Sequence, residues 1–194
     1  MHETFLGRQP IFDRNLEVYG YELLFRHSSG PDACVVDGDR ATSEVIFNTF
    51  TVFGLDELVG NHFAFINITR SFVINSGSIP LPAGRVVLEI LENTRPEPAI
   101  IDGIELMRAA GYRIALDDFV YDPTLLPLLQ RADLVKVEIP RLDLSELAEQ
   151  VQLLRPFNVT LLAEKIETPE VFEACKELGF DYFQGYFLSR PSTI

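Results

Sequence analysis

Oxygen-bearing side chains end a series of short apolar runs along this sequence. Together with one lysine they form a set: Glu22, Asn67, Glu89, Asp117, Lys136, Glu164 and Gln184. Carboxylate and amide oxygens are the ligands that hard cations such as Mg2+, Mn2+ and Ca2+ prefer. None of His2, His27 and His62 ends a core run in a way that suggests zinc. The residue types therefore predict a site for Mg2+ or Mn2+.

The adjacent acids Asp117 and Asp118 indicate that the site holds two ions. Neighbouring carboxylates can supply a bridging and a terminal ligand, and two-metal sites are typical of phosphodiester hydrolysis. Taken singly, a strand-end acid is more often a helix cap or a solvated charge, and Lys136 could simply pair with Glu138. Converging carboxylates repel one another, however, and need positive charge beside them. The occurrence of these groups together is what favours a metal site.

A repeating strand and helix pattern must position these groups. The expected strands are Arg8–Asp13, Glu17–Arg26, Phe63–Asn67, Val86–Glu89, Tyr112–Asp118, Leu134–Glu138, Val159–Glu164 and Tyr182–Gln184. A helix should begin after Thr168, an N-cap followed by Pro169, and end at Gly179. Two apolar stripes predict further helices and should lie in the core: Ile100, Ile104 and Met107, and Leu144, Leu147, Val151 and Leu154.

Side-chain alternation along these strands brings the polar ends together. If Glu89 faces inward, Val87 does too, while Val86 and Leu88 face the helices. The same parity gathers the whole set at one end, with Asp118 one step beyond. An open doubly wound sheet usually gathers its ligand at a single switch point, whereas nearly every strand here ends in a chemical group. We therefore expect an α/β fold, a shortened TIM-like (β/α)8 barrel with an N-terminal strand pair.

Composition narrows the range of partners. The chain has 194 residues, of which 47% are hydrophobic, enough for one domain with a sizeable core. Its formal net charge of −13 would repel extended nucleic acid, which is held mainly through lysine and arginine. No run has the length and apolarity of a membrane span, so we expect a cytoplasmic protein without membrane insertion. Cys34 and Cys175 are expected to be ordinary small hydrophobes.

Several motifs resemble those of the EAL domain family. Glu22-Leu23-Leu24-Phe25-Arg26 resembles the E-A-L-x-R signature, and Gln9-Pro10-Ile11 resembles the family's opening strand. The resemblance continues in chain order through Asn67-Ile68-Thr69, Leu88–Glu92, Ala115–Phe119, Val135–Glu138, Ala163–Glu167 and Gln184-Gly185-Tyr186. Ordered motifs over nearly the whole chain are far more specific than any one of them.

The resemblance implies a modified (β/α)8 barrel that hydrolyses cyclic di-GMP to the linear dinucleotide with two ions, Mg2+ or Mn2+. It implies that one ion is held by Glu22, Asn67, Glu89 and Asp117, that Asp117 and Asp118 share in the second, and that Glu164 and Lys136 help hold the metal-bound water. It further implies that Gln9, Arg26, Gln184 and Arg190 bind the nucleotide, and that Glu92 tethers the loop after Asp118.

The chain departs from the family pattern beside this expected site. Val120-Tyr121-Asp122-Pro123 replaces a glycine-threonine-glycine loop that in the family couples the metal site to dimerisation, Glu138 replaces an aspartate, and Lys165 replaces a glycine. A catalytically weak or inactive cyclic di-GMP receptor, or a protein-interaction module, is therefore the alternative to an active phosphodiesterase. An enolase-like barrel enzyme, with Lys136 as the base, is a third hypothesis.

The opening phrases Gly7–Asp13 and Gly20–Arg26 look most like the subgroup in which an EAL domain precedes an HDOD regulatory domain. We accordingly expect residues 1–194 to form a single EAL-like barrel domain, a fragment of a longer signalling protein. Its expected partners are cyclic di-GMP, a second copy of the chain, and a regulatory domain or partner protein.

Overall fold

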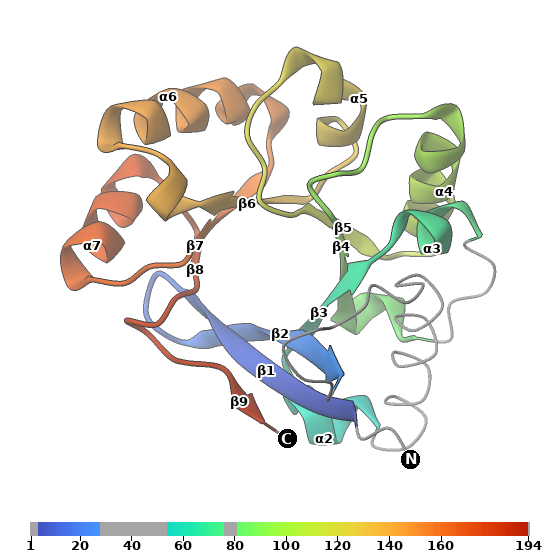
Figure 1. Ribbon diagram of the computed structural model, residues 1–194, viewed down its shortest axis with the longest axis horizontal. Coiled ribbons are helices and arrows are strands. Elements are labelled where there is room, and N and C mark those ends of the chain that lie inside the picture. Colours follow the sequence, from blue (N-terminus) through green and yellow to red (C-terminus); the bar gives the residue numbers. More distant parts are fainter. Residues whose placement is uncertain (1–3, 28–53, 76–80, 194) are drawn as a thin grey trace.

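The computed structural model describes residues 4–27, 54–75 and 81–193 as a ring of strands with helices outside it (Figure 1). The strands are β1 (Thr4–Asp13), β2 (Val18–His27), β3 (Phe63–Ile68), β4 (Val86–Ile90), β5 (Arg113–Leu116), β6 (Leu134–Glu138), β7 (Thr160–Glu164), β8 (Tyr182–Phe183) and β9 (Ser192–Thr193). Strands β2 to β8 are parallel neighbours in chain order. Their carboxyl ends therefore meet at one end of the barrel, which we call the mouth.

Strand β1 closes the ring and runs against its neighbours. It pairs antiparallel with β2, where Gln9 lies opposite Glu22, and antiparallel with β8, where Phe12 lies opposite Phe183. At the turn between β1 and β2, the Asp13 carboxylate accepts hydrogen bonds from the backbone N–H groups of Asn15 and Glu17 at 2.8 and 2.9 Å. The predicted α/β barrel and its N-terminal strand pair are both confirmed.

Two apolar clusters show that the predicted alternation is correct. One fills the ring interior and contains Ile11, Phe65, Val87, Ala115, Leu134 and Leu162, with Tyr19, Phe63 and Tyr182 packed against it. The other lies between strands and helices and contains Val86 and Leu88, the two residues expected to face outward from β4. The interior cluster forms an apolar floor beneath the polar side chains of the mouth.

Short and long helices cover the outside of the ring. They are α2 (Leu55–Val59), α3 (Arg70–Ile74), α4 (Pro98–Ala109), α5 (Leu126–Leu129), α6 (Leu144–Leu154) and α7 (Pro169–Leu178), with 3-10 turns η1 (Ala83–Arg85), η2 (Pro123–Leu125), η3 (Ile139–Arg141) and η4 (Arg155–Phe157). As predicted, the Thr168 side chain caps α7, and Gly179 ends it in a left-handed conformation with φ 98°. The predicted stripes are buried except at Leu144, which is 63% exposed.

The error at Leu144 has a local cause. Leu144 is the first residue of α6, directly after the N-cap Asp143, whose carboxylate accepts hydrogen bonds from the N–H groups of Ser145 and Glu146. Helical spacing alone assigned Leu144 to the buried face, but the chain has not yet turned toward the barrel there. Cys175 is fully buried in α7, as expected for a small hydrophobe, and Cys34 lies outside the described residues.

Several strand boundaries differ from the prediction, and two of them end a strand before a predicted site residue. Strand β5 stops at Leu116 and β8 at Phe183, so Asp117 and Gln184 lie one residue beyond the ladder. Both remain attached to it, because the Asp117 N–H donates to the Ile90 carbonyl and the Gln184 N–H donates to the Ala163 carbonyl, each at 2.9 Å. In the described part of the chain, no helix is long and apolar enough to cross a membrane.

The apolar floor predicts which substitution destabilises the barrel most. Phe65 is fully buried in the ring interior, with its ring centroid 6.1 Å from that of Tyr19. Phe65→Ala should lower the free energy of unfolding by about 3–5 kcal/mol, because it leaves a cavity where the strands converge. Urea unfolding followed by circular dichroism measures this. Leu106→Ala, at an exposed site on α4, is the control and should change stability by less than about 0.5 kcal/mol.

Candidate metal and phosphodiester site

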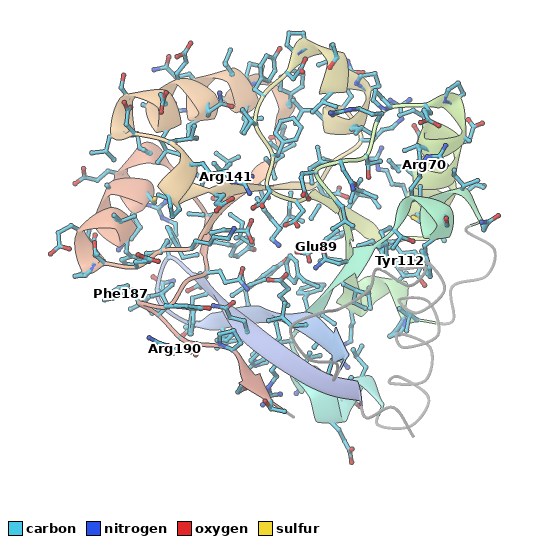
Figure 2. The ribbon with its side chains drawn as sticks, viewed as in Figure 1. Arg70, Glu89, Tyr112, Arg141, Phe187 and Arg190 are labelled. Carbon is cyan, nitrogen blue, oxygen red and sulfur yellow. The ribbon has the colours of Figure 1, made fainter. Side chains whose placement is uncertain are left out.

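A buried lysine lies at the centre of the mouth. Lys136, on β6, is 0% exposed, and its Nζ lies 2.7 Å from an Oε of Glu89 and 2.7 Å from an Oδ of Asp117. The same Nζ lies 3.0 Å from Glu164 and 3.8 Å from Glu22. Figure 2 shows Glu89 inside the ring, on the side of β4. One ammonium therefore holds together four carboxylates, from β2, β4 and β7 and from the residue after β5.

The charges in this cluster perturb one another strongly. Burial opposes the charge on Lys136, but the surrounding carboxylates of Glu164, Glu89, Glu22 and Asp117 outweigh it and raise the lysine pKa well above its usual value. Burial raises the pKa of Glu89 well above its ordinary range, although Lys136 partly offsets this effect. Burial likewise raises the pKa of Glu164 to about 8. With a single cation among four acids, the lysine does not neutralise all the negative charge of the group.

Amide side chains orient Glu22, the acid nearest to the opening strand pair. Gln184 Nε2 donates to one Glu22 carboxylate oxygen at 2.8 Å, and Asn67 Nδ2 donates to the other at 3.4 Å. Because both amides use their N–H groups on Glu22, the Asn67 carbonyl oxygen is left facing the cluster as an acceptor. The structure thus brings Glu22, Asn67 and Gln184 together with the carboxylates around Lys136.

Several buried oxygen atoms in this cluster lack a donor. Asn67 Oδ1, Glu89 Oε2 and Glu164 Oε2 have no hydrogen-bond partner among the residues that the structure describes. Unpaired buried acceptors are costly in the absence of a bound cation. Oxygen atoms of Asp117, Asp118 and Glu164 also lie within 4.8 Å of one another. The donor set and these unpaired oxygens both fit a hard divalent cation.

A second group of charges occupies the rim, and we call it the rim quartet: Asp118, Glu138, Arg141 and Lys165. Lys165 Nζ lies 2.7 Å from Glu138 Oε1 and 3.9 Å from Asp118 Oδ2. Arg141 lies 3.1 Å from the same Asp118 oxygen and also pairs with Glu138. Glu138 and Lys165, the two single-residue departures from the family pattern, are therefore partners of each other.

Backbone geometry gives the rim quartet its shape. Asp118 and Lys165 both adopt left-handed conformations, with φ of 44° and 58°. Such a conformation strains residues other than glycine and turns the chain sharply. It places both side chains over the mouth just after β5 and β7. Arg141 comes from η3, the turn that follows β6, and its label in Figure 2 lies on the β6 side of the ring. Sequence reasoning missed Arg141 as a site residue, because a 3-10 turn has no periodic signal.

The segment after β8 is held by close backbone packing. A Cβ added to Gly185 would lie 2.1 Å from the Ile166 carbonyl oxygen and 2.2 Å from its nitrogen, so only glycine fits there. The Ile166 N–H donates to the Gln184 carbonyl at 3.0 Å, and the Phe187 N–H donates to the Ile166 carbonyl at 3.0 Å. This clamp fixes Gln184 against the turn that follows Glu164.

Of the residues expected to bind nucleotide, Gln9 and Gln184 lie beside the carboxylates. Gln9 lines the same cavity as Glu22 and Gln184, and its Nε2 donates to the Ser189 carbonyl at 3.0 Å. Arg190 stacks on the Tyr186 ring, 5.0 Å from its centroid, and lies on the segment leading into β9 (Figure 2). Arg26 belongs to β2, but its side chain lies outside the described part of the structure.

The loop after Asp118 is attached to α6. The Tyr121 N–H donates to Gln150 Oε1 at 2.8 Å, and its ring lies 6.4 Å from that of Phe157, centroid to centroid. Glu92, the predicted tether, is exposed and makes no hydrogen bond or ion pair with the other described residues. The sequence offered no signal for Gln150, because the contact depends on how α6 lies against the barrel.

These features occur in a chain that belongs to the EAL domain family. Residues 65–191 match the family described as "EAL domain", and this confirms the family predicted from the motifs. The chain is 34% identical over 199 residues to the cyclic di-GMP phosphodiesterase CdgJ of Vibrio cholerae, covering 100% of this chain and 46% of that protein. It is also 34% identical over 196 residues to YuxH of Bacillus subtilis, covering 98% of this chain and 48% of that protein. The chain spans about half the length of these relatives.

Solved structures support the same fold. A manganese and cyclic di-GMP complex of BlrP1 from Klebsiella pneumoniae has a TM-score of 0.80 and 23% identity, covering 98% of this chain and 56% of that chain. The YkuI protein of Bacillus subtilis, in complex with cyclic di-GMP and calcium, has a TM-score of 0.78 and 23% identity, covering 97% of this chain and 56% of that chain. These similarities establish the barrel.

The raised pKa of Glu164 predicts how the free energy of unfolding depends on pH. Its folded pKa of about 8 exceeds the ordinary value of 4.5, so between these values the folded chain holds a proton that the unfolded chain has released. The free energy of unfolding of the metal-free chain should therefore fall as pH rises through this window. Thermal unfolding at a series of pH values measures it. Glu164→Gln should make the decline shallower and leave the part that the raised pKa of Glu89 contributes, and an equally steep decline in that variant would contradict the assignment.

Proposed function

We propose that this EAL domain hydrolyses one phosphodiester bond of cyclic di-GMP and releases the linear dinucleotide. The observation that carries the proposal is the set of acids around Lys136, which meets at the mouth of an EAL-type barrel with unpaired oxygens directed into it. Relatives named as cyclic di-GMP phosphodiesterases and structures complexed with that nucleotide support the choice of substrate. The overall negative charge argues against a longer nucleic acid.

We further propose that the site takes two divalent ions, Mg2+ or Mn2+. Glu22, Asn67, Glu89 and Asp117 would hold the inner ion, and Asp117 with Asp118 would hold the outer one. Ions bound there would lower the pKa of a water molecule and neutralise charge that builds up on the phosphate. The unpaired oxygens of Asn67 and Glu89 support the inner position, and the grouping of Asp117, Asp118 and Glu164 supports the outer one.

The chain's own side chains would orient and deprotonate the attacking water. Glu164 has an unpaired Oε2, and its pKa of about 8, raised by burial, is that of the metal-free chain. Divalent ions bound beside it would lower this pKa and leave the carboxylate able to accept a proton near neutral pH. Lys136 is fully buried, so we assign it the role of fixing Glu164, Glu89 and Asp117 in place and keeping a positive charge beneath the reacting phosphate. Water adds to phosphorus, the bond to the ribose oxygen breaks, and that oxygen takes up a proton.

Two adjoining hollows would receive the nucleotide. The larger has a volume of about 500 Å3 and is lined by Gln9, Glu22, Asp117, Glu164 and Gln184 among others. The smaller, of about 220 Å3, shares Leu24 and Tyr186 with the first and includes Arg190. We propose that Gln9, Gln184 and Arg190 bind guanine and phosphate here, together with Arg26. The stacked Arg190 and Tyr186 supply a flat cationic surface suited to a base.

A receptor that binds cyclic di-GMP without turnover is the second candidate. It is favoured by the rim quartet, in which Lys165 and Arg141 already neutralise Asp118 and Glu138. We also propose a cytoplasmic signalling role in which a second copy or a regulatory partner contacts the barrel. For the loop after Asp118 we propose Gln150 as the tether in place of Glu92, because it is Gln150 that bonds to the loop.

One assay separates an enzyme from a receptor. The purified chain is incubated with cyclic di-GMP and Mn2+, and the products are separated by chromatography. An enzyme should yield the linear dinucleotide, and Glu164→Gln should lower the rate about 100-fold or more because it removes the proton acceptor. The matched control is Glu149→Gln on the exposed face of α6, which should act like wild type. Calorimetric binding of the nucleotide without product would favour the receptor, and the absence of both would contradict the proposal.

A further inference from the structure

The mouth of the barrel is divided into two halves of unequal charge. Around Lys136, the carboxylates of Glu22, Glu89, Asp117 and Glu164 meet one ammonium. In the rim quartet, by contrast, two acids meet two bases, so the charges balance. The inner half therefore favours the binding of a further cation, whereas the acids of the outer half are already paired with Arg141 and Lys165.

The protein's own cations occupy the carboxylates that a second ion would use. Arg141 and Lys165 both approach Asp118 Oδ2, at 3.1 and 3.9 Å. Asp118 is also one of the acids whose oxygens lie within 4.8 Å of Asp117 and Glu164. An ion bound by these oxygens would lie beside an ammonium and a guanidinium, and like charges at such distances repel even in water.

Lys165 lies farther from Asp118 than Arg141 does, at 3.9 Å against 3.1 Å, and is therefore the more easily displaced of the two cations. Its side chain is 52% exposed, so its ammonium can leave the mouth without crossing packed side chains. Its backbone is left-handed, with φ 58°, a conformation that glycine adopts without strain. Lys165 pairs most closely with Glu138, at 2.7 Å, and that contact holds its ammonium over the mouth. The ammonium is thus a tethered monovalent cation at the edge of the outer metal position.

We propose that Lys165, held by Glu138, competes with the second divalent ion and sets the concentration of metal at which the outer position fills. This inference rests on the proposed two-ion site and assigns a new role to a residue within it. The inner position fills first and binds tightly, and the outer position binds more weakly. At low metal the chain holds nucleotide with one ion and an ammonium. At high metal the second ion displaces Lys165 and completes the site.

Counting bound manganese tests this without any turnover. The electron paramagnetic resonance signal of free Mn2+ is followed as Mn2+ is titrated into the full chain without nucleotide. Wild type should show one tight and one weak ion per chain. Lys165→Gly should tighten only the weak ion, by about tenfold, the size expected on removing one nearby unit charge. Lys176→Met is the matched control, because Lys176 lies on α7 and pairs with Glu173 away from the mouth.

A second variant separates the charge of Lys165 from its backbone strain. Lys165→Met keeps the length of the side chain and its left-handed backbone but removes the charge, so the weak ion should again bind about tenfold more tightly. A titration in which wild type binds no tight ion would overturn the proposed metal site itself. A tight ion with an outer affinity unchanged in both variants, or tightened only in Lys165→Gly, would leave the metal site standing and overturn the role of the Lys165 charge. Circular dichroism establishes that each variant is folded.

Discussion

The ion network around Lys136 is the interaction on which the rest of the site depends. Four carboxylates converge on a fully buried ammonium, and removing a partner from such a buried network leaves charges without compensation. The network is possible only because the ring is closed. Strand β1 seals the gap between β2 and β8, and the interior cluster of Phe65, Val87 and Leu162 keeps water away from below. The electrostatics of the site therefore depend on closure of the barrel.

The asymmetry of the mouth gives the two candidate functions a common physical basis. The inner carboxylates carry excess negative charge and unpaired oxygens, so a divalent ion there relieves an existing imbalance. The rim quartet has no such imbalance, because Lys165 and Arg141 already face Asp118 and Glu138. A barrel that binds nucleotide with one ion and cleaves it with two would be a receptor and an enzyme under different conditions. Metal supply then becomes a variable of the signalling response.

Much of the fold and of the inner cluster could be predicted from the sequence. Alternation along strands has a period of two, so taking Glu89, Asn67 and Glu164 as inward also placed Val87, Phe65 and Leu162, one on each strand. The rim was less predictable, since Lys165 reaches Glu138 through a left-handed turn and Arg141 comes from a 3-10 turn. Neither leaves a periodic pattern. The contact between Gln150 and Tyr121 likewise depends on how α6 lies against the barrel, which local sequence does not encode.

The reversed direction of β1 determines which ends of β1 and β9 lie at the mouth of the barrel. Thr4 pairs with His27 at the carboxyl end of β2, so β1 starts at the mouth and runs away from it. Strand β9 pairs antiparallel with β1 through Thr193 and Gly7, so β9 runs back toward the mouth. In an ordinary all-parallel barrel the first strand would start at the opposite end. Here, the start of β1 and the end of β9 both lie toward the mouth, so this edge of the barrel brings antiparallel backbone, in place of a parallel strand end, beside the carboxylates around Lys136.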